Sequence, residues 1–320
     1  MSEAKKPRVL VAAQPFGALD PQPRELLEAV AEVVWNPHER KLTRAELLKL
    51  LPGSVAVVAS TEPYDAEVLD AAPGLRLIAR TGVGLDSVDL RAAADREVWV
   101  TTTPDAPADS VAELTIGLLV SLARQVGQAD RDLRAGRWVR RTGWLLRDRT
   151  IGIVGFGRIG SRVARLLRPF RCRVLASDID PAIAPLADEL GVELLPLAKL
   201  APRVDALTFH VPLTPETRGL VDADFLATLK PGALLLNTAR GPVVQGAALL
   251  AALESGHLGG AALDVFEEEP YTGPLAARED VLLTCHMGSC SDSGRRAMEM
   301  GAAEAVVALL QGEEPLGRIV

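Results

Sequence analysis

Short apolar runs alternate with stretches of helical periodicity along almost the whole chain. Such runs predict buried strands, and apolar positions that recur at helical spacing predict amphipathic helices. In the first third of the chain, strands are expected at Arg8–Ala13, Val33–Trp35, Val55–Ala59, Leu77–Ala79 and Val98–Thr101. Helices are expected between them at Arg24–Ala31, Thr43–Leu50 and Asp65–Ala71. Strands that alternate with helices favour a parallel sheet with right-handed crossovers.

A second series of strand patterns begins near Thr150, after a long helical stretch that we expect to start near Ser110. Ser110 and Glu113 have the spacing of a capping box, which is typical of a helix start. The strands of this series are expected at Thr150–Val154, Arg173–Ser177, Ala206–Phe209, Ala233–Asn237, Gly260–Asp264 and Val281–Thr284.

The order of these elements predicts two domains, for which a chain of 320 residues is long enough. The final helical pattern, about Ser293–Leu310, has no strand left to pair with, so we expect it to return to the first domain. One domain is therefore predicted at 104–287, inserted into another that consists of 1–103 and 288–320.

Composition narrows the class of protein. The net charge of −7 argues against nucleic acid as a partner. Three cysteines give no paired framework and favour a reducing compartment. The N-terminus, Met1–Lys6, has no apolar segment of a secretory signal, and the longest apolar stretch, near Leu114–Leu122, is too short to span a bilayer. We expect a cytoplasmic protein that does not enter membranes.

A glycine-rich loop directly follows the strand predicted at Thr150–Val154 and opens a helical pattern. Gly155, Gly157 and Gly160 have the G-x-G-x-x-G spacing of a dinucleotide fingerprint. The first glycine permits a tight turn, the second lets the backbone approach a pyrophosphate, and the third lets helix and strand pack closely. The helix N-terminus would supply N–H groups to the phosphates.

Asp178 ends the next strand pattern and suits the ribose of the dinucleotide. Its carboxylate can accept hydrogen bonds from both ribose hydroxyls, whereas a 2′-phosphate would meet its negative charge. The segment from Ser177 to Asp180 contains no arginine that would receive such a phosphate. NAD is therefore expected rather than NADP. The alternative is that Asp178 only caps the helix that follows.

Polar residues follow three further strands of the same domain: Arg240, then Asp264 and Glu269, then His286. The carboxyl ends of parallel strands meet at one edge of the sheet, where ligands bind. Hydride transfer to a carbonyl needs a proton donor and a cation that holds an anionic substrate. An imidazole beside a carboxylate, and an arginine, fit these two needs. Each residue alone is more often an ordinary surface or loop residue; their joint placement favours catalysis.

Motifs spread over nearly the whole chain carry a resemblance to a known family. They are Tyr64–Leu69, Pro73–Leu75, Thr81–Asp86, Ser110–Glu113, Gly155–Gly160, His210–Thr217, Leu229–Gly232, Asn237–Gly241 and Ala262–Pro270. With these motifs the chain resembles the D-isomer-specific 2-hydroxyacid dehydrogenases, in the group similar to phosphoglycerate dehydrogenase. The resemblance implies an α/β fold of two doubly wound parallel-sheet domains, a Rossmann NAD domain inserted into a flavodoxin-like substrate domain.

The resemblance also implies roles for individual residues. Arg240 would bind the carboxylate and 2-oxo group of the substrate, Glu269 would orient the catalytic histidine, and His286 would be the acid/base. The backbone amides of Val83 and Gly84 would form a second carboxylate cradle. Cofactor contacts are implied at Gly155, Gly157, Arg158, Ile159, Asp178, His210, Pro212, Thr217, Thr238, Asp264, His286 and Gly288. No metal is expected.

The substrate is expected to be a small anionic 2-oxo or 2-hydroxy acid. Phosphoglycerate-type relatives carry an arginine at the position that matches Ala59, so phosphate recognition by that route is in doubt. Arg140 and Arg141 could replace it if the basic segment around them folds over the site. No C-terminal regulatory domain is expected.

The segment 110–148 is expected to form a homodimer interface, since relatives use this arm in that way. Two other functions stay open at this point. One is oxidation of a phosphorus-containing substrate such as phosphite or a phosphonate, and the other is a corepressor-like scaffold that senses NAD. Both share the fold, and neither is excluded by an intact set of Arg240, Glu269 and His286.

Overall fold

A computed structural model describes residues 6–320, and its contacts divide the chain into two compact units. One, here the discontinuous unit, consists of 6–107 with Ser289–Val320; the other, the continuous unit, is Ala108–Gly288. The expectation about a secretory signal concerns Met1–Lys6, of which 1–5 lie outside the described residues.

The discontinuous unit is built on a five-stranded parallel sheet with the order β2-β1-β3-β4-β5. This is the flavodoxin-like order of doubly wound sheets. The strands are β1 (Arg8–Val11), β2 (Glu32–Trp35), β3 (Ala56–Ala59), β4 (Leu77–Arg80) and β5 (Trp99–Thr101). The helices are α1 (Gln22–Val30), α2 (Arg44–Leu50), α3 (Ala66–Asp70), α4 (Leu90–Ala94) and α12 (Asp292–Gln311).

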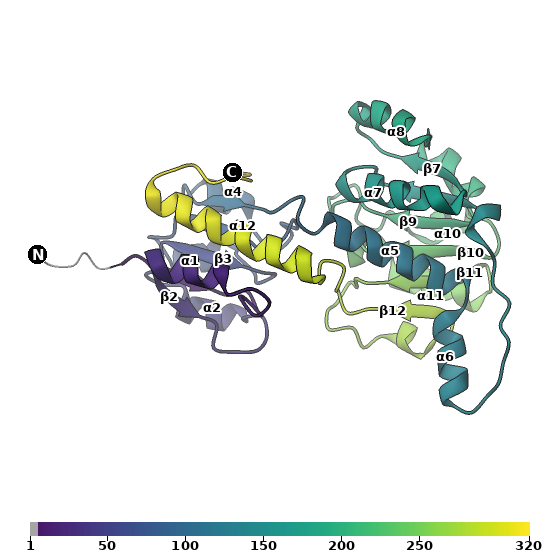
Figure 1. The fold of residues 1–320 in the computed structure, drawn as a ribbon, viewed down its shortest axis with the longest axis horizontal. Coiled ribbons are helices and arrows are strands. Elements are labelled where there is room, and N and C mark those ends of the chain that lie inside the picture. The colour runs from purple at the N-terminus through teal and green to yellow at the C-terminus, as the bar shows by residue number, and fades with distance from the viewer. Residues whose placement is uncertain (1–5) are drawn as a thin grey trace, which may run out of the picture. The chain divides into compact units, whose positions relative to one another are not determined.

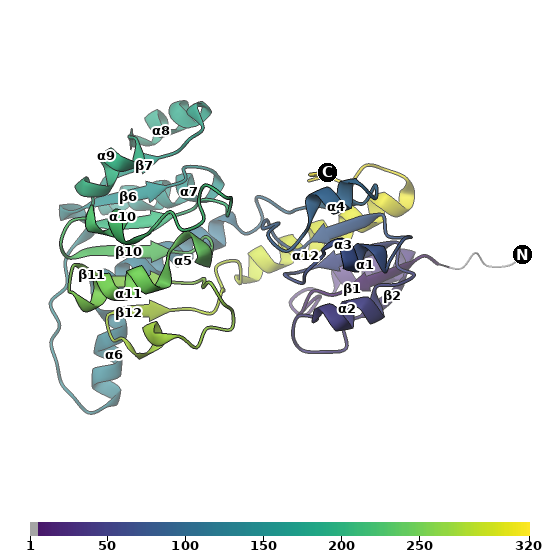
Figure 2. The ribbon, with the colours of Figure 1, turned by 180° about the vertical axis from the view of Figure 1, so that it is seen from behind.

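Each face of this sheet carries its own hydrophobic core. On one face Leu27 of α1 and Val306 of α12 pack with the strands, and on the other Leu47 of α2 and Val68 of α3 do so. Figure 1 shows α1 and α12 in front of the sheet, and Figure 2 shows α2, α3 and α4 on the opposite side. The helix at the end of the chain therefore completes the core of the unit that begins it.

The continuous unit has a seven-stranded parallel sheet with the order β12-β11-β10-β9-β6-β7-β8. Counted from β6, this is the Rossmann order with a seventh strand at the end. The strands are β6 (Thr150–Val154), β7 (Arg173–Ser177), β8 (Glu193–Leu194), β9 (Ala206–Phe209), β10 (Ala233–Asn237), β11 (Leu258–Leu263) and β12 (Val281–Leu283). The expected fold class, two doubly wound parallel-sheet domains, is confirmed.

Helices cover both faces of the larger sheet. They are α5 (Ala108–Ala123), α6 (Val126–Arg134), α7 (Arg158–Leu167), α8 (Ala184–Leu190), α9 (Leu197–Leu200), α10 (Ala223–Ala227) and α11 (Gly246–Glu254). Helices α5 and α7 lie side by side on one face (Figure 1), and α10 and α11 lie on the other (Figure 2).

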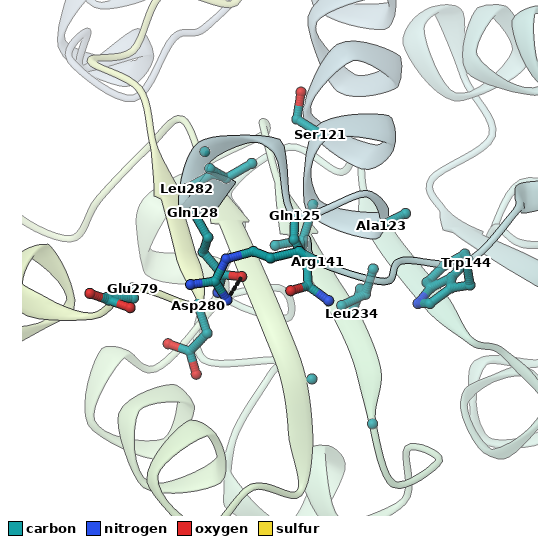
Figure 3. Close-up of a pocket in the computed structure, with 14 residues that line it drawn as sticks. Ser121, Ala123, Gln125, Gln128, Arg141, Trp144, Leu234, Glu279, Asp280 and Leu282 are labelled. Atoms are coloured by element: carbon teal, nitrogen blue, oxygen red, sulfur yellow. Dashed lines mark hydrogen bonds between the residues drawn. The ribbon is translucent and has the colours of Figure 1, made fainter. Parts of the chain in front are cut away.

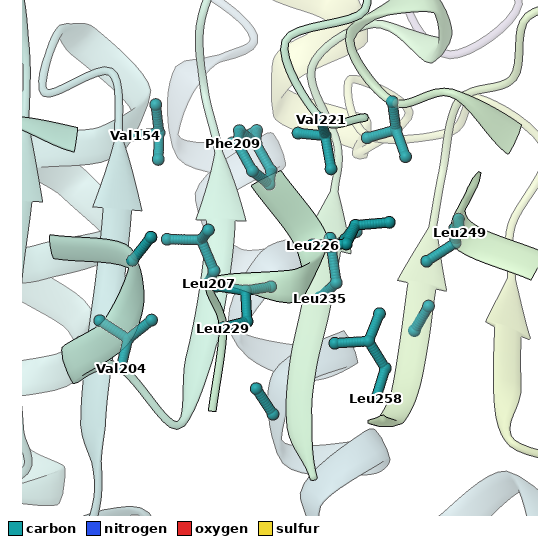
Figure 4. Close-up of a cluster of buried hydrophobic side chains, with 14 of the residues drawn as sticks. Val154, Val204, Leu207, Phe209, Val221, Leu226, Leu229, Leu235, Leu249 and Leu258 are labelled. Carbon is teal, nitrogen blue, oxygen red and sulfur yellow. The ribbon is translucent and has the colours of Figure 1, made fainter. Parts of the chain in front are cut away.

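The core beneath α10 and α11 holds the site-bearing strands in register. Phe209, Leu207 and Leu235 are fully buried and meet Leu226 of α10 and Leu249 of α11 (Figure 4). Phe209 also packs edge-on against Phe225, with ring centroids 6.3 Å apart. This packing fixes the carboxyl ends of β9 and β10, from which site residues project.

Two local expectations were wrong, and one strand was not expected. Helix α5 begins at Ala108, directly after Pro107, whose restricted φ suits a helix start, so Ser110 lies in the first turn and not at the cap. The long helix that was expected breaks at Gln125, whose φ is +53°, and α6 follows as a separate helix. Strand β8 was missed because two residues give no periodicity. Among the described residues no helix is both long and apolar enough to cross a bilayer.

Candidate active site

The glycine loop of the continuous unit joins β6 to α7, at the point where the strand order reverses. Gly155 has φ +88°, and a Cβ there would stand 2.6 Å from the carbonyl oxygen of His210 at the end of β9. A Cβ at Gly160 would collide with the Gly155 carbonyl, whereas one at Gly157 would meet nothing within 4 Å. The loop is therefore tight at Gly155 and Gly160 and open at Gly157, as a bound pyrophosphate requires. This geometry fits a dinucleotide.

Arg158 and Ile159 begin α7, with Gly157 as the N-cap residue. No side chain caps this helix, so its first N–H groups and the positive end of its dipole are directed to the open side of the loop. Such a terminus is suited to a phosphate group.

Asp178 lies at the end of β7, next to the glycine loop. Its Oδ2 accepts a hydrogen bond from the Phe156 N–H at 2.5 Å, and its Oδ1 accepts one from the Asp180 N–H at 2.9 Å. The carboxylate is thus tied to the loop that would bind the pyrophosphate. The alternative, that Asp178 only caps the following helix, loses support because Asp180, not Asp178, caps the turn at Pro181.

His210, Pro212 and Thr217 lie on the loop that follows β9. The Thr217 hydroxyl donates to the Pro212 carbonyl oxygen at 2.7 Å, which closes the loop between them. The His210 ring meets the Thr208 hydroxyl through Nε2 at 3.1 Å, and burial lowers its pKa to about 3. The imidazole of His210 is consequently neutral at ordinary pH.

Arg240 stands on a turn that Asn237 shapes. The Asn237 amide donates to the Arg240 carbonyl oxygen at 2.8 Å, and its oxygen accepts from the Ala239 N–H at 3.0 Å. Next to it, Gly241 lies directly on the backbone of Phe266 and Glu267, where a Cβ would overlap the Phe266 carbonyl. Only glycine lets the Arg240 turn approach the loop that carries Glu269 so closely.

Asp264 lies at the end of β11 and is 1% exposed. Its carboxylate accepts hydrogen bonds from the Thr284 hydroxyl at 2.6 Å, the Met287 N–H at 2.9 Å and the Gly288 N–H at 2.8 Å. Its carbonyl oxygen accepts the His286 N–H at 2.7 Å. Asp264 therefore shapes the turn on which His286 stands, in addition to any contact with a cofactor.

His286 and Glu269 form the titratable pair of the site. Their Nδ1 and Oε2 atoms are 2.8 Å apart, and both side chains are about one third exposed, at 38% and 35%. The other oxygen of Glu269 accepts the Phe266 N–H at 3.1 Å. His286 has φ +53°, a conformation that non-glycine residues rarely adopt and that the Asp264 bonds enforce.

Thr238 is buried between β10 and α5. Its hydroxyl is 3.0 Å from that of Thr115, which also reaches the Val111 carbonyl at 2.8 Å. The remaining expected residues, Val83 and Gly84, lie in the discontinuous unit, on the loop that follows β4. In the described chain, no group of three or more His, Cys, Asp or Glu side chains could hold a metal ion.

Sequence reasoning missed the residues that shape the site. Asn237, Gly241 and Thr284 were not proposed as site residues, yet each fixes the turn of one that was. A signal existed for Asn237, because a buried polar residue at the end of an apolar strand needs partners. Gly241 gave no such signal, since its contact comes from a segment 25 residues away in the chain.

The chain is similar to known proteins over most of its length. Residues 116–288 match the family model described as D-isomer specific 2-hydroxyacid dehydrogenase, NAD binding domain. The chain is 38% identical over 323 residues to a glyoxylate reductase of Aeropyrum pernix, with 97% of this chain and 95% of that protein aligned. It is 42% identical over 275 residues to a D-3-phosphoglycerate dehydrogenase of Mycobacterium leprae, covering 84% of this chain but only 52% of that protein.

Among solved structures, the TT0316 protein from Thermus thermophilus superposes with a TM-score of 0.88. It is 38% identical and covers 98% of this chain and 100% of its own. The chain belongs to the family of D-isomer-specific 2-hydroxyacid dehydrogenases, which are oxidoreductases that use a nicotinamide cofactor.

The part-buried ring of His210, whose Nδ1 atom is buried without a hydrogen-bond partner among the described residues, predicts a pH dependence of stability. An unfolded histidine binds a proton below about pH 6.5, whereas the native ring, with its pKa of about 3, does not. Between these values the unfolded chain binds more protons, so His210 makes the free energy of unfolding fall as the pH falls from about 6.5. His210→Gln should flatten this loss, measured as the urea midpoint of the continuous unit between about pH 7 and 5.

Nuclear magnetic resonance of the ring provides a direct check on the wild type. The His210 signals should keep their neutral positions down to about pH 4, above the native pKa of about 3. A titration midpoint near 6.5 would contradict the prediction.

Proposed function

We propose that the protein interconverts a small 2-oxo acid and its D-2-hydroxy acid with NAD, and that Arg240, Glu269 and His286 carry the reaction. The observation that carries the proposal is the Nδ1–Oε2 contact of His286 with Glu269 at 2.8 Å, after strands β12 and β11, at the same edge of the sheet as the glycine loop. The Arg240 turn lies against the Glu269 loop through Gly241.

In this proposal each unit of the chain binds a different ligand. The continuous unit binds NAD through the glycine loop and the residues at its strand ends, and the discontinuous unit receives the substrate carboxylate on the amides of Val83 and Gly84. The cofactor supplies or accepts the hydride at the substrate carbon.

His286 moves the proton of the reaction. With Nδ1 directed to Glu269, Nε2 is the nitrogen that faces the substrate, and it donates its proton to the carbonyl oxygen during reduction. The Glu269 carboxylate stabilises the imidazolium and fixes the orientation of the ring. In oxidation the neutral ring takes the proton back from the hydroxyl group. Arg240 offers a planar set of donors to the carboxylate and polarises the carbonyl.

A small acid without a phosphate group fits the discontinuous unit best. Ala59, at the position where phosphoglycerate-type relatives carry arginine, is fully buried at the end of β3. Arg141 is bound to Asp132 within its own unit, at 2.8 Å from Nε to Oδ2. One relative that matches over nearly its whole length is a glyoxylate reductase. We therefore infer glyoxylate or hydroxypyruvate as the substrate class.

We also infer a cytoplasmic location, which the three free thiols of the chain support.

The second copy in a homodimer would contact α6 and the segment that follows it. These elements extend from the body of the continuous unit in both views (Figures 1 and 2). They expose large apolar side chains, at Val126, Leu133, Trp138, Val139 and Leu145. A concentration of exposed apolar side chains of this kind marks an interface.

Two features of this surface favour contact with a second copy of the chain. The buried carboxylate of Asp132 accepts hydrogen bonds from Arg137 and Arg141, which hold the segment against α6, and the Arg137 bond lowers the Asp132 pKa. A hollow of about 270 Å³ adjoins it, with Gln128, Arg141 and Trp144 in its wall (Figure 3). It lies at the amino ends of β10–β12, opposite the proposed active site, so it is available to a partner side chain.

Turnover of 2-oxo acids tests the proposed function. We expect NADH oxidation with glyoxylate or hydroxypyruvate, and slower oxidation with 3-phosphohydroxypyruvate. His286→Ala should lower kcat by roughly 10²–10⁴-fold, the usual contribution of a general acid. Glu269→Gln should lower it less, because the amide keeps the hydrogen bond but not the charge. Stopped-flow or steady-state absorbance at the NADH band measures both.

Binding of NADH is the control, and both variants should bind it as the wild type does. Turnover of phosphite with NAD in place of the 2-oxo acids would favour the phosphorus-oxidising alternative. NADH binding without turnover of any compound would favour the NAD-sensing scaffold.

Asp178 predicts the choice between NADH and NADPH. The wild type should use NADH better by roughly tenfold to a hundredfold, because a hydrogen bond to a charged group contributes about 1.5–3 kcal/mol. Asp178→Asn should reduce that ratio of kcat/KM values by about tenfold. Asp180→Asn, two residues away, is the matched control and should leave the ratio unchanged. Equal use of both cofactors by the wild type would disprove the assignment.

Trp138, which is 80% exposed, predicts the dimer contact. Trp138→Glu should raise the dimer dissociation constant by about thirtyfold or more, since a buried interface tryptophan commonly contributes about 2 kcal/mol or more. Sedimentation equilibrium measures the constant. Phe170→Glu, at an exposed aromatic position elsewhere in the unit, is the control. A wild type that stays monomeric at micromolar concentration would contradict the proposal.

A further inference from the structure

A buried arginine lies beneath the loop on which Val83 and Gly84 stand. Arg80 ends β4 and is only 5% exposed. Its Nε and Nη2 atoms both donate to the carbonyl oxygen of Gly84, at 2.9 and 2.8 Å. A guanidinium that is removed from water needs strong partners, and a carbonyl held by two of its N–H groups has little freedom to turn.

A second carbonyl of the same loop also accepts a hydrogen bond from within the unit. The Gly82 carbonyl oxygen accepts the Thr103 N–H at 3.0 Å. In a trans peptide the N–H of the next residue points opposite to the carbonyl oxygen. The N–H groups of Val83 and Leu85 are therefore turned away from Thr103 and Arg80.

The amides of the loop are left for another acceptor. Within residues 6–320, the Val83, Gly84 and Leu85 N–H groups donate to no other residue. The Val83 side chain is 43% exposed, so this edge of the loop reaches solvent. Successive outward N–H groups form a concavity that suits an anion.

Backbone hydrogen bonds from the rest of the unit fix both ends of the loop, and the Leu85 carbonyl accepts the Val88 N–H at 2.9 Å. At the start, the Thr81 N–H donates to Ala59 at 2.9 Å. At the end, the Tyr64 N–H donates to Ser87 at 2.7 Å, and the Tyr64 carbonyl accepts the Asp89 N–H at 2.9 Å. At the centre of the loop, the Gly84 carbonyl is held by hydrogen bonds from the side chain of Arg80.

A buried carboxyl group, that of Glu62, lies near the buried guanidinium of Arg80. Glu62 is fully buried, and its Oε2 accepts the Ser60 N–H at 2.8 Å. Burial raises the Glu62 pKa, while the positive charge of Arg80 acts in the opposite direction. A packing role alone would not need a cation at this position, because an apolar side chain of the same length fills such a space at lower cost.

We infer that Arg80 is a positioning residue for the substrate: by holding the Gly84 carbonyl it turns the Leu85 N–H outward and fixes the loop whose Val83 and Gly84 amides would receive the substrate carboxylate. The inference rests on the proposed function. Arg80 contacts no substrate itself, and its charge acts through the peptide groups of the loop.

The test compares Arg80→Met and Arg80→Lys with the wild type. Arg80→Met should raise the KM of the 2-oxo acid by roughly tenfold to a hundredfold, the effect of losing hydrogen bonds from a charged donor. The value of kcat at saturation should change less than threefold, because His286 and Glu269 are untouched, and the NADH dissociation constant should stay unchanged. Arg80→Lys, which keeps one charged donor, should give an intermediate KM.

Binding of oxamate, an unreactive analogue of a 2-oxo acid, separates binding from chemistry. Calorimetry in the presence of NADH should show the same loss of oxamate affinity as the KM values. Arg8→Met is the matched control, since Arg8 also donates from a guanidinium to a backbone carbonyl, that of Leu50 at 2.9 Å, in the same unit. It should leave KM and oxamate binding unchanged.

Each outcome decides the inference. A KM and an oxamate affinity that stay within twofold in Arg80→Met, or that change equally in Arg8→Met, would overturn it. If Arg80→Met does not fold, as judged from its thermal midpoint and NADH binding, the raised KM of Arg80→Lys carries the test, and an unchanged KM there overturns it. A wild type that binds oxamate but turns over no 2-oxo acid would refute the proposed function. In that case the oxamate affinities of the wild type and Arg80→Met, measured by calorimetry, would still test the role of Arg80.

Discussion

The buried carboxylate of Asp264 is the interaction on which the candidate site depends. An unpaired charge in the interior costs several kcal/mol, so a carboxylate that is 1% exposed must be surrounded by donors. The donors are the Thr284 hydroxyl and the Met287 and Gly288 amides, all on the segment after β12. Through its own N–H, Asp264 also reaches the Asn237 carbonyl at the end of β10. The carboxylate and the backbone N–H of Asp264 together join the ends of three adjacent strands.

The carboxylates of Asp264 and Glu269 have different surroundings. Asp264 has its donors fixed by the fold and is enclosed, which makes it a structural group. Glu269 is about one third exposed, and its oxygens accept the Phe266 N–H and contact the His286 ring. A carboxylate in that situation can respond to the charge of its partner, as an acid/base pair requires. The positive φ of His286 is the strain that the Asp264 bonds maintain.

The sequence predicted the strands well because buried parallel strands read as continuous apolar runs. It predicted Arg240, Glu269 and His286 as candidates because strand ends of a doubly wound sheet converge. It did not predict Gly241 or Arg80, since their roles come from contacts that the local pattern does not encode. It also missed the break at Gln125, where a left-handed residue interrupts an otherwise helical pattern. Local periodicity therefore finds elements and their ends, whereas the shape of each turn depends on tertiary contacts.

The two groups that are proposed to bind an anion differ in kind, and each is shaped by contacts inside its own unit. In the continuous unit the turn of Arg240 is fixed by Asn237 and Gly241. In the discontinuous unit the charge of Arg80 is bound to a peptide carbonyl, so the loop would offer the substrate polarised amides and no second cation. A second cation beside the substrate would disfavour the imidazolium that reduction requires. The neutral amides of the loop in the discontinuous unit would receive a carboxylate without that cost.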